Sequence, residues 1–413
     1  MLSRRIQCST KTLRRHLHTS SALQNTAQTL ITQKIVGARQ ETDNVRELDT
    51  LLKAVKKRVE PSTQSIVPIQ RGSIPWAQAL LDATRVREPP ARENPVSQEA
   101  LELRSMHDSY TEIFLPFGSS PDLLEQYTNA SGGIRTGKLL EHLDSLAGSI
   151  SYKHMLGPGV ETLGRIGERG YYIVTASVDR DAYINRAHPV NPLKTLSPEE
   201  KALQAIGEFH RKRRQSLALR SLSRVPPSSE EAEVLHSFVL KYGNEAAENR
   251  EDKERVWMGD TASERTMLMF PQERNVHQKV FGGYLMRLAY ELGFTNSRLF
   301  TRRRIRFVSL DKISFAKPVP IGSILRLTSH ILHSTSSERY PWIVHTRVLA
   351  HVLDVETGSE MVTNDFRFTW CAHDGPPLDR MIVPKTYQEA MLWLEGRREL
   401  EIGAEIQGAL HSK

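Results

Sequence analysis

The chain has 413 residues, of which 56 are Lys or Arg and 48 are Asp or Glu, so its net charge is +8. That length allows two or three domains, and the hydrophobic and charged fractions of 39% and 25% exclude collagen-like, disulfide-rich and wholly disordered classes. No apolar run approaches the roughly 18 residues of a membrane-spanning helix. The two cysteines, Cys8 and Cys371, exclude a disulfide framework and a cysteine-based zinc site.

Most of the excess positive charge lies in the first forty residues. They hold seven basic side chains and no acidic one, and the remaining 49 basic and 48 acidic residues leave a net charge of +1. A nearly neutral body argues against a nucleic-acid partner. Residues 1–24 are rich in Arg, Ser and Thr without a continuous apolar core, which is typical of a mitochondrial transit peptide. We expect a matrix protein whose mature chain starts between His18 and Asn25, the alternative being a disordered basic tail.

The first half of the remaining chain has few strongly periodic segments. Residues 25–105 are polar with scattered prolines, which predicts a partly disordered extension. A short β-type run at Ile113–Leu115 precedes a helix over Gly137–Ser149, whose leucines recur every three or four residues. Tyr171–Val178 is predicted to be a strand. Charged helical stretches over 193–260 predict a helical connector between two domains.

The second half follows one order of strand, long helix and four strands. The short strand is predicted over Thr266–Phe270 and the helix over Phe281–Phe294. Alternating apolar residues then predict four strands over Arg306–Phe315, Ser323–Leu332, Ile343–Leu353 and Val362–Trp370. This order predicts an α+β fold in which one antiparallel sheet wraps around one helix.

The two halves align with each other at a constant offset of 146 residues. At that offset Asn129 falls on Asn275, and Gly137 falls on Gly283, with each glycine at the start of a predicted helix. A repeat of this length indicates a duplicated domain.

The segment Asn275–Gly283, with the sequence Asn-Val-His-Gln-Lys-Val-Phe-Gly-Gly, is the most informative in the chain. Its asparagine and its glycine pair at a helix start resemble the active-site loop of hotdog-fold acyl-CoA thioesterases. Over about residues 105–400 the chain resembles the mitochondrial double-hotdog members of this family, of the acyl-coenzyme A thioesterase 9 type. The motifs that carry this resemblance are Glu112–Gly118, Pro189–Leu193, Phe315–Val319 and Val383–Met391.

The resemblance implies a composite site between the two hotdogs. Its catalytic residues are Asp144 from the first hotdog, and Asn275 and Gly283 from the second, while Phe281 and Gly282 are expected to contact the substrate. Thioester hydrolysis needs an activated water and a stabilised oxyanion. The N-terminus of a helix supplies N–H groups and the positive end of a dipole, and glycine lets a carbonyl approach closely.

A second candidate site pairs Asn129 with Glu291. It is the weaker of the two, because the residue at the offset position of Asp144 is Tyr290 and not an acid.

Each site residue also has a structural explanation. An asparagine before a helix often caps it or forms a turn, an aspartate among leucines can face solvent, and a glycine pair can serve close packing; only their joint spacing favours catalysis. The sequence contains no GxSxG, HExxH, P-loop or GxGxxG motif, which argues against serine hydrolases, metalloproteases and dehydrogenases. No metal and no cofactor is expected.

The first hotdog departs from the family pattern. In the second hotdog, 55 residues separate Phe315 from Trp370 and hold three strands. In the first, the strand Tyr171–Val178 runs directly into a segment without counterparts to those strands. In the family that the chain resembles, most of a sheet separates the runs that match Val174–Arg180 and Asp181–Leu193. We infer that a block of about 50 residues is missing at the junction of Arg180 and Asp181, through a skipped exon in the gene model, a splice form or a real loss.

The sequence therefore predicts an α+β protein with two hotdog domains, the first incomplete. We expect an acyl-CoA thioesterase that releases free acid and CoA, with acyl-CoA as substrate, no nucleic-acid partner, no stable membrane anchor and a homo-oligomeric assembly. The alternative is a catalytically impaired hotdog protein that acts as a binding or oligomer subunit. The predicted segments are a transit peptide (1–24), an extension (25–105), the first hotdog (106–192), a helical connector (193–260), the second hotdog (261–378) and a C-terminal helix (379–413).

Overall fold

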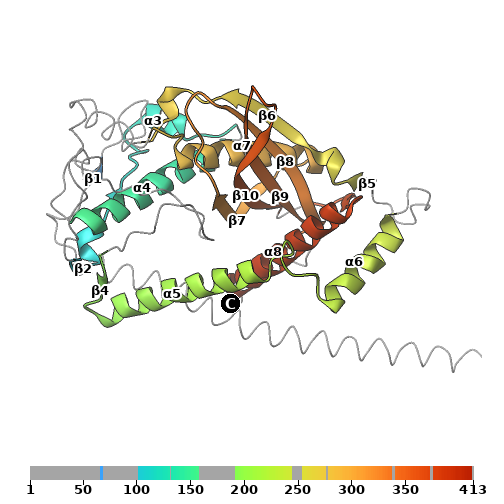
Figure 1. Cartoon of the computed structure of the whole chain (residues 1–413), viewed down its shortest axis with the longest axis horizontal. Helices are drawn as coiled ribbons and strands as arrows, with labels where there is room; N and C mark the ends of the chain where they lie inside the picture. The colour runs from blue at the N-terminus through green and yellow to red at the C-terminus, as the bar shows by residue number, and fades with distance from the viewer. Residues whose placement is uncertain are drawn as a thin grey trace, which may run out of the picture.

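The computed structural model describes residues 66–67, 101–130, 132–157, 191–243, 254–275, 278–336, 340–372 and 375–411. The transit-peptide segment and the strand expected over Tyr171–Val178 lie outside these residues. Figure 1 shows the arrangement of the described part, in which a twisted sheet holds a long helix against it and a second long helix packs beside it.

The sheet has five strands, and every neighbouring pair in it is antiparallel. Its strand order is β6-β8-β9-β10-β7. The bounds are β6 Ser263–Leu268, β7 Arg306–Phe315, β8 Ile324–Thr335, β9 Trp342–Leu353 and β10 Glu360–Ala372. All five strands of the second half are confirmed within a few residues. The alternation of buried and less buried side chains is clearest in β8.

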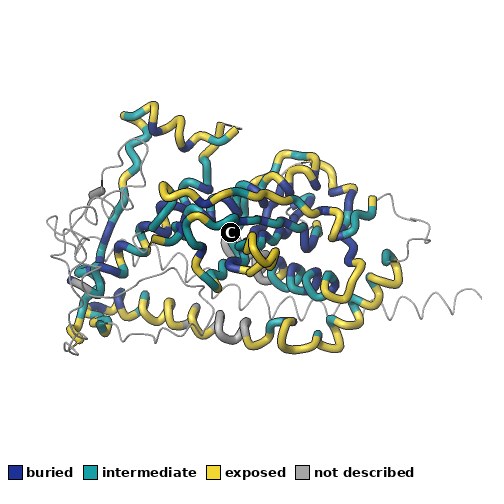
Figure 2. The backbone as a smooth tube through the Cα atoms, turned by 45° about the horizontal axis from the view of Figure 1, so that its top comes forward, coloured by how far each residue is buried: buried dark blue, intermediate teal, exposed yellow. Residues whose placement is uncertain are grey.

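Helix α7, Gly282–Thr301, packs on one face of this sheet and forms the main core with it. Its residues Leu285, Leu288, Ala289 and Leu292 are at most 8% exposed. They pack on strand residues that share one side of β10, namely Phe366, Phe368 and Trp370, each 0% exposed. Figure 2 shows that burial concentrates in this part of the molecule. A sheet wrapped around one helix is the α+β arrangement that the sequence predicts.

Helix α7 is two turns longer than predicted, since it ends at Thr301 and not at Phe294. The added turns bury polar residues, so the apolar pattern stops before the helix does. Asn296 donates a hydrogen bond to Ser329 Oγ at 3.0 Å, and the Ser297 hydroxyl lies 2.6 Å from that of Thr346. These pairs satisfy the buried polar groups, which would otherwise destabilise the core.

The C-terminal segment contains more than the helix expected over 379–413. Strand β11, Arg380–Val383, pairs in parallel with β5, Glu254–Trp257, and only then does helix α8 run from Tyr387 to His411. The strand was missed because its four residues are too few for a periodic signal. β5 also lies within the segment predicted to be a helical connector, whose helices are α5 Pro198–Leu219 and α6 Ser229–Tyr242.

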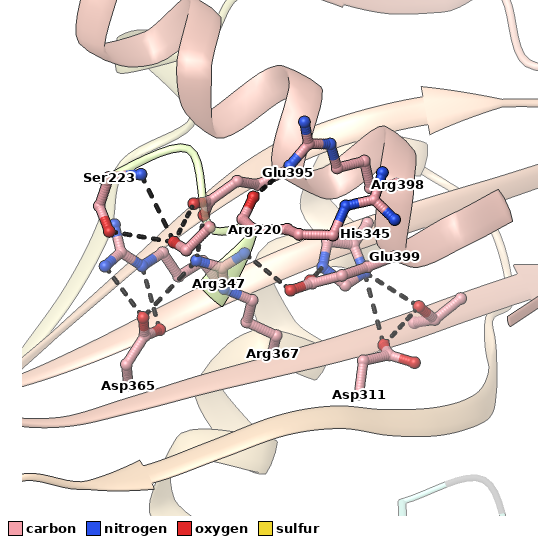
Figure 3. Close-up of polar contacts among 12 residues, drawn as sticks. Arg220, Ser223, Asp311, His345, Arg347, Asp365, Arg367, Glu395, Arg398 and Glu399 are labelled. Carbon is pink, nitrogen blue, oxygen red and sulfur yellow. Dashed lines mark hydrogen bonds and ion pairs between the residues drawn. The ribbon is translucent and has the colours of Figure 1, made fainter. Parts of the chain in front are cut away.

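Helix α8 is held to the other face of the sheet by a buried charge cluster, drawn in Figure 3. Arg367 of β10 is 2% exposed, and its guanidinium lies 2.6 Å from Glu395 and 2.9 Å from Glu399 of α8. Asp365 lies 3.7 Å from Arg367, and His345 Nε2 lies 2.6 Å from Glu399. Burial alone would raise the pKa of Glu399, but the Arg367 charge and the His345 contact lower it to about 2.

Among the described residues that precede the connector, the long helix is α4, Thr136–Leu156, which includes the predicted range and packs against α7. The shorter elements around it are β1 Ile66–Val67, β2 Arg104–Ser105, β3 Glu112–Ile113, α3 Pro121–Gln126 and β4 Leu193–Lys194. Single turns of 3-10 helix span His107–Ser109, Gly259–Thr261 and Pro271–Glu273. β1 pairs with β3 and β2 with β4, each over two residues.

The face of α4 that points away from α7 is partly open to solvent. Leu143 and Ile150 are 59% and 37% exposed. Their counterparts at the offset of 146, Ala289 and Asn296, are 0% and 3% exposed beneath the sheet of the second half. The same helix face is therefore covered in one repeat and exposed in the other.

We predict that the contacts of Glu399 with Arg367 and His345 make the free energy of unfolding fall in acid. The pKa of the Glu399 carboxyl is lowered from its ordinary value of 4.5 to about 2 in the folded protein. The ionised carboxylate therefore stabilises the fold by about 3 kcal/mol above pH 4.5, and this contribution is lost as the pH falls towards 2. We expect Glu399→Gln to lower the free energy of unfolding near neutral pH and to flatten its fall in acid, measured by urea denaturation at each pH. Glu401→Gln is the control, since Glu401 pairs with Arg397 at the surface of the same helix. Equal acid sensitivity in wild type and Glu399→Gln would contradict the assignment.

Candidate active site

Each long helix is preceded by the same loop. The Asn129 N–H donates to the Gly133 carbonyl at 2.8 Å, and the Asn275 N–H donates to the Lys279 carbonyl at 2.6 Å. In return, the Gly133 N–H donates to Asn129 Oδ1 at 3.0 Å, and the Lys279 N–H donates to Asn275 Oδ1 at 3.1 Å. These four bonds are related by the offset of 146, so the sequence repeat is also a repeat of backbone structure.

The repeat extends to backbone conformation and to the helix starts. Gly132 and Gln278, again 146 apart, both have positive φ angles, of 83° and 57°. Helices α4 and α7 begin at Thr136 and Gly282, at the same offset. The two helices are therefore equivalent elements of a duplicated unit.

The two helices cross antiparallel, and glycines allow them to approach closely. A Cβ atom on Gly283 would lie 2.8 Å from the Cα of Glu141 and 3.0 Å from its carbonyl oxygen. A Cβ atom on Gly137 would lie 3.0 Å from Cγ of Arg287. Gly137 and Gly283, and Glu141 and Arg287, are also 146 apart, so the crossing follows the pseudo-twofold relation of the repeat.

The crossing brings Asp144 of α4 to the N-terminus of α7. Its Oδ2 accepts a hydrogen bond of 2.6 Å from the Gly283 N–H, and its side chain is 6% exposed. A Cβ atom on Gly282 would lie 2.9 Å from the same oxygen. The structure therefore places together three residues that the sequence singled out from both halves. The N-terminal end of a helix favours a carboxylate there through its unpaired N–H groups and its dipole.

Asn275 and Phe281 belong to the loop that leads to this helix end. Asn275 closes the loop through the two bonds to Lys279 described above. Phe281 is the N-cap residue of α7; its N–H donates to the Glu273 carbonyl at 2.8 Å, and its ring lies beside Gly283. Both residues therefore shape the approach to Gly282 and Gly283.

The second candidate site, at the start of α4, contains different side chains from the site at the start of α7. Glu291 forms an ion pair with Arg135, with Nη2 and Oε1 2.5 Å apart, and the Asn129 amide donates to the Ile134 carbonyl at 3.1 Å. Tyr290, at the offset position of Asp144, hydrogen-bonds the Thr136 side chain, and burial raises the pKa of its hydroxyl. A phenol thus occupies the place that a carboxylate has at α7.

Sequence reasoning missed a group of charges beside Asp144. Glu141, 1% exposed, lies between Arg287 and Lys138, at 2.6 Å and 2.9 Å. Near them the pKa of Glu273 is raised by burial and by Glu141, against the opposing effect of Arg287 and Lys138. The sequence repeat contained a signal for the Glu141–Arg287 pair, because these equivalent positions carry opposite charges.

The arginines Arg302–Arg304 lie at the far end of α7. Helix α7 has 20 residues, which corresponds to a length of about 30 Å. With Phe294, Thr295, Arg298 and Leu299 they line a surface cavity of about 690 Å³. These arginines are therefore not part of the site at Asp144.

In the described part of the chain, no helix is long and apolar enough to cross a membrane. Within the same ranges, no cluster of three or more His, Cys, Asp or Glu side chains could hold a metal ion. The groups assembled at the start of α7 are a buried carboxylate, glycine backbone and an amide-bearing loop, which suit acid–base chemistry on a polarised carbonyl.

Several known proteins are similar to the chain over most of its length, although no protein-family model matches it. The mouse protein acyl-coenzyme A thioesterase 10, mitochondrial, is 31% identical over 361 residues, covering 74% of this chain and 80% of the relative. The human acyl-coenzyme A thioesterase 9, mitochondrial, is 31% identical and covers 73% of this chain and 79% of the relative. Acyl-coenzyme A thioesterase 4, mitochondrial, of Humulus lupulus is 28% identical, with coverage of 73% and 68%.

Solved structures of acyl-CoA hydrolases also match part of the protein. An acyl-CoA hydrolase from Staphylococcus aureus in complex with butyryl-CoA is 20% identical, covers 36% of this chain and 90% of its own, and has a TM-score of 0.33. An acyl-CoA hydrolase from Bacillus cereus is 18% identical, covers 39% and 100%, and has a TM-score of 0.32.

We predict that the crossing does not tolerate a side chain at Gly283. In Gly283→Ala the new methyl group meets the backbone of Glu141, which cannot rotate away, so the free energy of unfolding should fall by about 1–3 kcal/mol. Gly137→Ala meets only the flexible side chain of Arg287 closely and should cost less. Gly148→Ala, in the same helix with open space around it, should stabilise by about 0.5–1 kcal/mol. Thermal and urea denaturation of the three variants measure this order, and a Gly283→Ala protein as stable as Gly148→Ala would contradict it.

Proposed function

The chain belongs to the acyl-CoA thioesterase family of its mitochondrial relatives, and from this premise we propose that it hydrolyses acyl-CoA thioesters at the N-terminus of α7. The observation that carries the assignment of the site is the hydrogen bond from the Gly283 N–H to the buried Asp144 carboxylate. It joins a residue of each half at one helix end. A lone buried carboxylate is costly unless it has such partners, which supports a functional role.

In the proposed reaction Asp144 acts as general base. It takes a proton from a water molecule, the water oxygen attacks the thioester carbonyl carbon, and the carbonyl oxygen becomes negatively charged. N–H groups of the first turn of α7 and the positive end of its dipole stabilise that charge. The carbonyl then re-forms as the carbon–sulfur bond breaks, and the leaving CoA thiolate takes up the proton that Asp144 had accepted. Free acid and CoA are the products.

We assign supporting roles to the residues around Asp144. Asn275 orients the water or donates to the substrate carbonyl through its amide, and Phe281 and Gly282 contact the acyl group and the thioester. The absence of a Cβ at Gly282 supports the arrangement, since a Cβ there would lie 2.9 Å from Asp144 Oδ2 and would keep the carboxylate away from the helix end. Asn129 and Glu291 have no catalytic role in this proposal, because Tyr290 occupies the position of the base.

We further propose that the first hotdog lacks part of its sheet. Two observations support this. Leu143 on α4 is 59% exposed, whereas its counterpart Ala289 is covered by a sheet. In addition, the alignment with the mouse relative spans 361 positions but covers only 74% of 413 residues, which leaves about 55 positions without a residue of this chain. This number agrees with the block inferred from the repeat.

The cellular setting follows from the same family and the N-terminal charge pattern. We propose a protein of the mitochondrial matrix, on the basis of the acid-free basic segment and the mitochondrial relatives. A homo-oligomer is proposed as its assembly, because an exposed apolar helix face such as that around Leu143 favours association.

We predict that Asp144→Asn and Asn275→Ala each slow acyl-CoA hydrolysis. Loss of a general base typically costs about 10²–10⁴-fold, and release of free CoA thiol from a panel of acyl-CoAs measures the rate. Glu291→Gln, assayed in parallel, should keep the wild-type rate, since its carboxylate is paired with Arg135. A slow Glu291→Gln together with an unaffected Asp144→Asn would transfer the reaction to the other helix end.

We also predict that the chain gains stability and activity when the inferred block is restored after Arg180 from a relative. Covering the face around Leu143 and Ile150 buries apolar surface, worth about 25 cal/mol per Å², and fixes α4 from its second side. The restored and the 413-residue forms are compared by melting temperature and by specific activity. Equal values in both measurements would mean that α4 needs no sheet of its own.

A further inference from the structure

The carboxylate of Glu141 is the most completely buried charge at the crossing of α4 and α7. It is 1% exposed, with Arg287 Nε 2.6 Å from one oxygen and Lys138 Nζ 2.9 Å from the other. A buried ion that loses its partner destabilises strongly, whereas a paired one fixes the geometry of its partner. The Glu141–Arg287 contact therefore fixes one point on α4 against one point on α7.

Arg287 is itself held in place on α7. Its guanidinium lies over the ring of Tyr284, 5.0 Å from the centroid, and its side chain is 16% exposed. A planar guanidinium held by a ring and by a carboxylate has little freedom to reorient. The ion pair thus joins two rigid elements.

Glu141 and Asp144 are three residues apart on α4, so their side chains lie on one face of the helix. Both meet Gly283. The backbone of Glu141 lies where a Cβ of Gly283 would be, and Asp144 accepts the Gly283 N–H. The Ser145 hydroxyl donates to the Glu141 carbonyl at 3.1 Å, which adds to the order at this point.

We propose that the Glu141–Arg287 ion pair, supported by Lys138, is a positioning device for Asp144. It fixes the rotation and slide of α4 on α7, and so holds the Asp144 carboxylate at the first turn of α7. This inference rests on the proposed function, in which Asp144 is the base. A displacement of about 1 Å at a catalytic group can cost about a hundredfold in rate, which is the size of effect a positioning residue controls.

A second ion pair between the same helices provides a matched control. Arg135 and Glu291 join α4 to α7 at the other side of the crossing, with side chains 36% and 30% exposed. If ion pairs at this interface only dock the helices, breaking either pair should affect the reaction alike. If Glu141 positions Asp144, breaking the Glu141–Arg287 pair should lower kcat, whereas breaking the Arg135–Glu291 pair should not.

The experiment is a double-mutant cycle with kcat and KM measured by CoA release. We expect Glu141→Gln to lower kcat about a hundredfold with KM within threefold, and Arg135→Gln to keep kcat within threefold. Combined with Asp144→Asn, Glu141→Gln should add no further loss, because a positioning residue has no effect once the group it positions is absent. Additive losses, or an unchanged kcat in Glu141→Gln, would overturn the inference.

Two further measurements keep the outcome unambiguous. If Glu141→Gln does not fold, Arg287→Lys, which retains the charge but not the planar fork, replaces it. We expect it to lower kcat about tenfold with the same non-additivity towards Asp144→Asn, and an additive loss or none would count against positioning. A wild-type protein that hydrolyses no acyl-CoA, or an Asp144→Asn variant as fast as wild type, would instead contradict the proposed function itself.

Discussion

One hydrogen bond, from the Gly283 N–H to the Asp144 carboxylate, requires helices α4 and α7 to pack in one defined position. Its donor and acceptor are 139 residues apart in the chain, so it forms only when two helices of different repeats dock in one register. The bond places a negative group at the positive end of a helix, where the N–H groups of the first turn stabilise it. The glycine pair, the loop closed by Asn275 and the charge pair at Glu141 all serve this docking.

The same docking explains the division of the protein into two differently supported halves. Helix α7 is fixed from outside the interface by five strands, and those strands are in turn fixed by α8 through the cluster around Arg367. Helix α4 has no comparable cover among the described residues, as the exposure of Leu143 indicates. Contacts with α7 therefore contribute most of what orients Asp144. The five-stranded sheet and α7 together support the helix of the first half.

Sequence reasoning could predict the parts of this arrangement that local patterns determine. The strands of the second sheet follow from alternation, as in β9, where Val344, Thr346 and Val348 are buried on one side. It could not predict the end of α7, because Asn296 and Ser297 are buried with partners on distant strands, or β11, whose four residues depend on β5. The pairing of Asp144 with Gly283 was predicted through family resemblance, whereas the Glu141–Arg287 pair needed three-dimensional contacts to be recognised.

The charge pair also indicates what duplication makes possible. Positions 141 and 287 are equivalent in the two repeats and meet each other across the pseudo-twofold relation. In a dimer of identical chains the same residue would meet itself there, and two buried glutamates or two buried arginines would repel each other. A duplicated chain can place opposite charges at such a point. The same freedom places a carboxylate, Asp144, at the start of one helix and a phenol, Tyr290, at the equivalent place of the other. Loss of symmetry at the crossing is thus the physical condition for a buried ion pair between equivalent positions of the two repeats.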